Sequence, residues 1–269
     1  RAFGSGTTFE SQDSQHSGYD SSGTAVQIGK DIYQHEGPNG RRDRAGLYIA
    51  QGHTSANMFS DAEQTGTARF DATSVGGYWT HYSSKGAYVD TVAQYSRIDA
   101  LAIDATDGSA INPSGNSYVG SVEVGQSFSL GKNTTLEPQA QVIYQHLTFD
   151  DDYDGTAHVE YADTDTVTGR IGLRAAHRFK TDNMTIDPWA RVNVLHTVQK
   201  DSELSIDDTD KFTTPVGGTI GEVQTGFTIG QTTSDGSGWA IYGGGGYHFS
   251  MDETKNSGWT ANAGLKISW

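Results

Sequence analysis

The last stretch of the chain reads Gly258-Trp259-Thr260-Ala261-Asn262-Ala263-Gly264-Leu265-Lys266-Ile267-Ser268-Trp269. Apolar and polar or small residues alternate along it. One face would carry Trp259, Ala261, Ala263, Leu265, Ile267 and Trp269. A period of two is typical of a β-strand with one apolar and one polar face, because successive side chains of a strand point to opposite sides.

The same two-sided pattern recurs along the whole chain and predicts twelve strands. For example, Val167, Ile171 and Leu173 alternate with Arg170 and Arg174. The predicted strands lie near residues 1–9, 24–36, 41–54, 67–82, 86–102, 117–131, 134–149, 165–179, 184–199, 218–232, 238–250 and 258–269.

The connections between these segments alternate in length. Short turns are predicted near 37–40, 83–85, 132–133, 180–183 and 234–237. Longer loops rich in Asp, Ser, Gly and Thr are predicted near 10–23, 55–66, 103–116, 150–164, 200–217 and 251–257. Short turns on one side and long loops on the other are typical of a transmembrane β-barrel. We therefore predict an all-β, antiparallel, up-and-down barrel of twelve strands with both ends on the periplasmic side.

The alternative fold is a soluble β-sandwich or a lipocalin-like barrel, which must fill its inner face with apolar side chains. Here the polar face carries Arg, Glu, Gln and Asn in most strands, and only 34% of the 269 residues are hydrophobic. A lipid-facing outside and a wet inside explain both observations. Many strand ends also carry aromatic residues, expected in girdles at the membrane surfaces, among them Tyr33, Tyr82, Tyr88, Tyr95, Tyr118, Tyr144, Phe149, Tyr247 and Trp259.

The charge and the cysteine count exclude other classes of function. The net charge is −15, whereas nucleic-acid binding requires a basic surface, so no nucleic-acid partner is expected. The chain has no Cys, so it has neither disulfides nor a thiolate metal site.

Several separate motifs, in order along the chain, resemble the C-terminal β-domain of autotransporters, the proteins of type V secretion. They are Gly46–His53, Ser74–Tyr82, Gly86–Tyr95, Ser121–Gly125, Leu136–Gln141, Gly169–Leu173, Pro188–Asn193 and the closing stretch Gly258–Trp269. The likeness extends from Arg1 to Trp269 and is greatest to the adhesin-bearing AIDA and antigen 43 type.

This resemblance implies one translocator domain over residues 1–269, located in the bacterial outer membrane. Such a domain exports its own N-terminal passenger, here expected to be an adhesin. The resemblance also implies a pore helix upstream of the first strand, and Arg1 to Gly4 resemble the middle of that strand. The expected partners are the passenger and pore helix, outer-membrane lipid, periplasmic chaperones and the barrel-insertion machinery. We expect a monomer without cofactor, metal or catalytic residues.

Inward-facing polar residues are the first candidate site. Glu123, Glu137, Arg170 and Arg191 fall on four successive predicted strands, and opposite charges on neighbouring strands can pair. We predict that the pore is lined by Glu123, Glu137, Gln139, Gln141, Arg170, Arg174, Arg191 and Glu222. These residues would either brace the barrel or contact the pore helix and the passing chain.

The terminal strand is the second candidate site. Alternating apolar residues before a final aromatic residue resemble the signal read by the barrel-insertion machinery. Here that signal would comprise Trp259, Leu265, Ile267 and Trp269. The alternative is that these side chains simply face lipid.

Two other functions stay open on the sequence. A stand-alone porin would need no passenger, and twelve strands give a narrow interior. An outer-membrane protease or phospholipase would use Asp, His or Ser at the rim, but no spacing here defines such a site. The run Asp150, Asp152, Asp154, Gly155 begins like a calcium loop. Its twelfth position is Tyr161 instead of Glu, which favours a solvated acidic loop.

Overall fold

The computed structural model describes residues 2–10, 17–61, 63–106, 110–154, 156–181, 183–199, 202–206, 210–214, 217–232, 237–252 and 255–268. In this part of the chain the strands are β1 (Ala2–Glu10), β2 (Gly18–Glu36), β3 (Arg42–Ser60), β4 (Glu63–Tyr82), β5 (Ala87–Ala105), β6 (Ala110–Ile111), β7 (Gly115–Gln126), β8 (Phe128–Ser129), β9 (Thr134–Phe149), β10 (Asp152–Tyr153), β11 (His158–Tyr161), β12 (Thr164–His177), β13 (Phe179–Lys180), β14 (Thr185–Gln199), β15 (Ser202–Ile206), β16 (Asp210–Thr214), β17 (Gly218–Thr232), β18 (Gly238–Ser250) and β19 (Lys255–Ser268).

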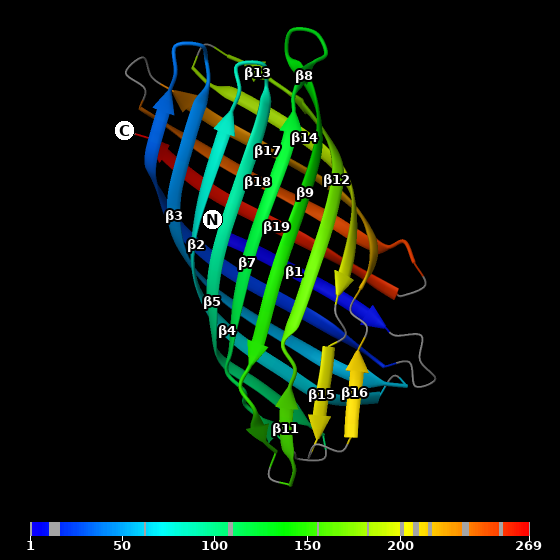
Figure 1. Ribbon diagram of the computed structural model, residues 1–269. Helices are drawn as coiled ribbons and strands as arrows, with labels where there is room; N and C mark the ends of the chain where they lie inside the picture. The colour runs from blue at the N-terminus through cyan, green and yellow to red at the C-terminus, as the bar shows by residue number, and fades with distance from the viewer. Residues whose placement is uncertain are drawn as a thin grey trace.

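Twelve of these strands form one closed antiparallel sheet, in the order β1, β2, β3, β4, β5, β7, β9, β12, β14, β17, β18, β19. β19 returns to pair with β1, from Ala2 opposite Ala263 to Glu10 opposite Lys255. The result is the tilted barrel of Figure 1. β8 and β13 are short continuations beside β9 and β14. The predicted twelve-stranded up-and-down barrel is therefore confirmed.

The two faces of the barrel wall have opposite chemistry. Large apolar side chains lie exposed on the outside, as in Ile28, which is 70% exposed. Polar side chains are buried on the inside, including Arg170 at 6% and Asn193 at 4% exposure. Soluble proteins show the reverse arrangement, because water favours apolar burial. This distribution fits a wall that meets hydrocarbon outside and water or polar groups inside.

The connections at one end of the barrel are tight turns. After β2, the amide of Gly40 donates to the carbonyl of Gly37 at 3.0 Å, and Gly40 has a φ of 75°. After β4, Gly86 has a φ of 86°, and its amide donates to the Ser83 carbonyl. Glycine adopts this left-handed conformation without the Cβ penalty of other residues, which suits it to such turns. Short turns mark the periplasmic end of an outer-membrane barrel.

Strands at the opposite end extend beyond their predicted limits. The region 55–66 was predicted as a long loop. Instead β3 and β4 pair as far as Ser60 opposite Glu63, with Asp61 in a left-handed turn at a φ of 48°. β2 likewise begins at Gly18, within the predicted loop 10–23. The prediction assigned strands only where apolar residues alternate. Backbone hydrogen bonds continue to pair the strands beyond the membrane, where both faces of the sheet are polar.

The predicted loops 150–164 and 200–217 also contain strands. They form a separate four-stranded sheet in the order β10-β11-β15-β16, seen beyond the barrel end in Figure 1. Val159 of β11 is buried, and the Tyr161 ring lies 5.7 Å from that of Phe149. Burial raises the pKa of Tyr161 to about 12, and the carboxylates of Asp152 and Asp151 add to the rise. Sequence alone did not predict this extracellular sheet.

No helix among the described residues is long and apolar enough to span a membrane.

Candidate functional site: the lumenal polar network

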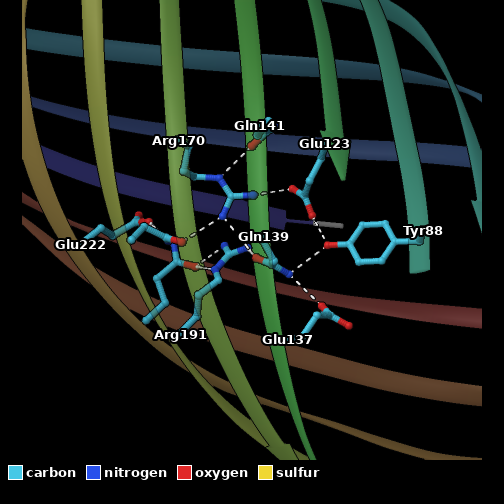
Figure 2. A network of polar contacts seen from close by, with 10 residues as sticks. Tyr88, Glu123, Glu137, Gln139, Gln141, Arg170, Arg191 and Glu222 are labelled. Atoms are coloured by element: carbon cyan, nitrogen blue, oxygen red, sulfur yellow. Dashed lines mark hydrogen bonds and ion pairs between the residues drawn. The ribbon is translucent and has the colours of Figure 1, made fainter. Parts of the chain in front are cut away.

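Six adjacent strands, β5, β7, β9, β12, β14 and β17, bring the inward polar residues together. In the strand register, Glu123 of β7 lies opposite Gln141 of β9, which lies opposite Arg170 of β12. One row nearer the periplasmic end, Asn193 of β14 lies opposite Glu222 of β17. Because side chains of one face recur every second residue, the two rows are neighbours on the inner face, and long side chains of one row can reach the other. Figure 2 shows them converging over the wall formed by these strands.

Arg170 is the centre of the network. Its Nε donates to Gln141 Oε1 at 2.9 Å, and its Nη1 donates to Asn193 Oδ1 at 2.9 Å and to Gln139 Oε1 at 3.3 Å. Its Nη2 forms an ion pair with Glu123 Oε2 at 2.5 Å. One nearly buried guanidinium therefore joins side chains from β7, β9 and β14 to β12.

Gln139 links this centre to the neighbouring wall. Its Nε2 donates to Glu137 Oε1 at 2.8 Å and to the Tyr88 hydroxyl at 3.0 Å. The Tyr88 hydroxyl in turn donates to Glu123, and the Ser127 hydroxyl donates to Glu137. Tyr88 belongs to β5, so the network crosses from β5 to β9 over the intervening β7.

Arg191 and Glu222 extend the network to β17. Arg191 donates through Nε to Gln224 Oε1 at 3.0 Å and through Nη1 to Gln139 Oε1 at 3.4 Å. Glu222 accepts from Asn193 Nδ2 and from Gln224 Nε2, each at 2.6 Å. The Glu123 carboxylate is thus ion-paired with Arg170, and the Glu222 carboxylate is held by two side-chain amides. Paired, hydrogen-bonded charges of this kind are what a partly buried site tolerates.

The structure brings seven of the eight predicted pore-lining residues into this network, and it places Arg174 beside it. The Arg174 guanidinium lies 5.4 Å over the Trp189 ring, in cation–π geometry. Trp189 in turn packs over Gly226 and Gly244, where an added Cβ would lie 2.5 and 3.0 Å from its ring. The indole of Trp189 thus occupies space beside the glycine run Gly243 to Gly246 that larger side chains would fill.

Four network residues were not among the predicted site residues, namely Tyr88, Ser127, Asn193 and Gln224. Tyr88 was assigned to the membrane girdle because it lies at a strand end. That assignment is wrong, because Tyr88 hydrogen-bonds Glu123 inside the barrel, as Figure 2 shows. Tyr82, whose ring lies 5.9 Å from that of Tyr88, is inside with it. Asn193 and Gln224 share the polar faces of Arg191 and Glu222, so the period of two already placed them there.

The arrangement supplies a polar inner wall. Among the described residues, no three His, Asp or Glu side chains converge to hold a metal ion. Asp154 of the acidic run accepts hydrogen bonds from the amides of Thr156 and Ala157, both at 2.7 Å, as in an Asx turn.

A family model, described as the autotransporter beta-domain, matches residues 1–234. The chain belongs to the autotransporter β-domain family. This membership agrees with the closed barrel, its polar inner wall and its apolar outer belt, and it places the domain in the outer membrane.

Known relatives agree with this assignment. Autotransporter CRAC of Citrobacter rodentium is 24% identical over 208 residues, 76% of this chain and 13% of the relative. The autotransporter adhesin/invasin TibA of Escherichia coli is 25% identical over 179 residues, 65% of this chain and 18% of the relative. The transport unit of AIDA-I from E. coli has the same fold, with a TM-score of 0.79 at 18% identity over 100% of this chain and 89% of that one. The chain thus spans less than a fifth of the length of CRAC and of TibA.

In this autotransporter β-domain, the apolar face of β19 points to lipid. Trp259, Leu265 and Ile267 are all more than half exposed on the outer surface. Trp269 lies outside the described residues. The described part of the terminal strand is therefore accessible on the outside of the closed barrel.

The packing of Tyr88 against Gly125 gives a first testable prediction. These residues lie opposite each other on β5 and β7, and a Cβ on Gly125 would lie within 3 Å of two ring carbons and the hydroxyl oxygen of Tyr88. Gly125→Ala must displace the ring and its hydrogen bonds, so we expect a loss of about 1–3 kcal/mol in unfolding free energy. Gly169→Ala is the matched control, because a Cβ there meets nothing within 4 Å. Urea unfolding in detergent, followed by heat-modifiable electrophoresis, measures both. Equal midpoints would contradict the prediction.

Proposed function

We propose that this β-domain anchors in the outer membrane and carries its own N-terminal passenger through the lumen to the cell surface. The observation that carries the proposal is the membership of the chain in the autotransporter β-domain family. The polar inner wall supports it, because a polar wall lets an extended polypeptide pass without stranding its backbone groups. The name of the relative TibA, an adhesin/invasin, favours an adhesin as the passenger.

The lumenal network would then have two roles. It ties β5, β7, β9, β12, β14 and β17 together through side chains, which fixes the shape of one half of the barrel. It also presents Glu, Gln and Arg groups to whatever occupies the lumen, first the passing chain and then a pore helix upstream of β1. No catalytic step and no cofactor are part of this proposal.

The terminal strand would direct assembly. We propose that the barrel-insertion machinery recognises Trp259, Leu265 and Ile267, with Trp269, after periplasmic chaperones have delivered the unfolded chain. The finished barrel would act as a monomer, since β19 pairs with β1 of the same chain.

A surface-display experiment tests the export function. A signal peptide, an epitope-tagged reporter and a helical segment are joined ahead of Arg1, and intact cells are treated with protease and with antibody. We expect the reporter to be labelled and cleaved on intact cells, while the barrel resists protease and remains heat-modifiable. The control is the same signal peptide and reporter without the β-domain, which should stay in the periplasm.

The result that would overturn the proposal is a reporter held in the periplasm beside a folded, inserted barrel. That result would favour the alternative function, a stand-alone narrow channel. Conductance of the purified barrel in a planar bilayer would then measure the channel function directly.

A further inference from the structure

A hollow lies on the lipid-facing side of the barrel, over β5, β7 and β9. The register places Ala93 opposite Gly120, and Gly120 opposite Tyr144. The next row toward the extracellular end holds Tyr95 opposite Tyr118. Ala93 and Gly120, two of the smallest residues, thus lie side by side and are surrounded by the three tyrosine rings. The resulting cavity has a volume of about 400 Å³ and is open to the outside.

The frame of this hollow is held in place by hydrogen bonds. The Tyr95 hydroxyl donates to Asn116 Oδ1 at 2.7 Å, and the Tyr144 hydroxyl donates to Asp165 Oδ1 at 2.6 Å. The rings of Tyr95 and Tyr118 pack with centroids 5.2 Å apart. Above Gly120 the space is empty, because an added Cβ would meet no heavy atom within 4 Å. If the rings of Tyr95 and Tyr144 moved to cover Gly120, they would lose these hydrogen bonds and the ring contact.

The height of the hollow identifies the leaflet it faces. The row below it toward the periplasmic end is mostly apolar, with Val122 opposite Val142. The row above it is polar and holds Arg97 opposite Asn116. The row of Tyr95 and Tyr118 continues into the pair His146–Asp165, whose Nδ1 and Oδ1 atoms are 2.9 Å apart. Tyrosine rings with their hydroxyls turned toward polar groups are typical of the membrane–water interface. The hollow thus lies where hydrocarbon meets the headgroups of the outer leaflet.

We infer that this hollow binds one acyl chain of an outer-leaflet glycolipid. The apolar floor of Ala93 and Gly120 and the flat faces of three rings suit a saturated chain, which gains contact with a preformed apolar surface. The Arg97 side chain is 40% exposed and lies one row above Tyr95. Its Nη2 lies 3.8 Å from Asp150 Oδ2 and its Nη1 donates to Asn116 Oδ1 at 3.4 Å, so a phosphate of the glycolipid headgroup would share this guanidinium with them. The Asp165 carboxylate lies one row lower, in the row of Tyr95 and Tyr118. This inference goes beyond the export function and does not depend on it.

Native mass spectrometry of the purified chain in a mild detergent tests the inference. The probe is a hexa-acylated lipid A, compared at equal concentration with a dipalmitoyl phosphatidylethanolamine. We expect one lipid A to stay bound per barrel and the phospholipid to be retained at least tenfold less. Gly120→Leu and Ala93→Leu fill the hollow with apolar side chains and should each reduce lipid A retention at least tenfold.

Ala190→Leu is the matched control, because Ala190 is an exposed outward-facing alanine on β14, away from the hollow. It should retain lipid A as the unmodified protein does. Heat-modifiable electrophoresis shows that each variant is folded, and Ala93→Leu carries the test if Gly120→Leu does not fold. The inference is overturned if Ala93→Leu retains as much lipid A as Ala190→Leu does. It is also overturned if the phospholipid binds as well as lipid A.

Discussion

Replacing Arg170 with Met should lower the unfolding free energy of the barrel by about 3–5 kcal/mol, the usual cost of leaving a buried charge without its partner. The substitution keeps a long apolar stem but removes the guanidinium. Glu123, with its side chain 19% exposed, then loses its ion pair. Gln141, Asn193 and Gln139 each lose one hydrogen bond. The measurement is the urea midpoint of the folded barrel in detergent.

A second arginine provides the control for this prediction. Arg178 pairs with Asp187 at 2.7 Å near the periplasmic turn, but its side chain is 55% exposed. Arg178→Met should therefore cost about 1 kcal/mol or less, because solvent screens exposed pairs. The double variant Glu123→Gln with Arg170→Met should recover part of the loss, since the carboxylate that paired with Arg170 is then neutral. A single Arg170→Met variant as stable as Arg178→Met would contradict the buried-network interpretation.

Deleting residues 258–269 should abolish the folded barrel altogether. Most of β19 is removed, and with it the partners of β18 and of Ala2 to Thr7 in β1. The remaining sheet cannot close, and exposed backbone groups at its edges cannot be satisfied in lipid. We expect no heat-modifiable species, no protease-resistant core and no reporter on the cell surface.

A deletion of similar length elsewhere gives the comparison. Within residues 202–214, Ser202–Ile206 and Asp210–Thr214 form β15 and β16. In the described part of the chain these two strands pair with β11 and with each other but not with the barrel wall. Their removal should leave a folded, heat-modifiable barrel, because no wall strand loses a neighbour. If both deletions abolish folding equally, the effect reflects chain length or expression instead of closure.

Most of the fold could be predicted from the sequence because each wall strand has a different solvent on its two faces. The alternation in β12 reflects lipid on one side and a polar lumen on the other, with Val167, Ile171 and Leu173 facing out and Arg170 and Arg174 facing in. The inward position of Glu123, Arg170 and Glu222 followed from the same period. Whether they contact one another could not be predicted, because this depends on register and on side-chain reach across several strands.

The errors in the prediction have identifiable physical causes. Tyr88 is as amphipathic as a girdle residue, and only its register opposite Gly125 places it in the lumen. The extracellular ends of β3 and β4 carry Ser, Thr, Asn and Gly on both faces, so no apolar period marks them. β11 and β15 come from loops far apart in the chain, and no local pattern indicates that they pair.

The pairing of neighbours in sequence also determines the order in which this molecule can be built. Eleven of the twelve contacts between wall strands join consecutive wall strands, so they can form as hairpins with low contact order. The remaining contact joins the two ends of the chain and must form last. Until then, the intermediate carries two open edges able to add a strand from another copy. The time between the first hairpin and the last contact is therefore the period of greatest exposure to aggregation, and it is when a holding chaperone would matter most.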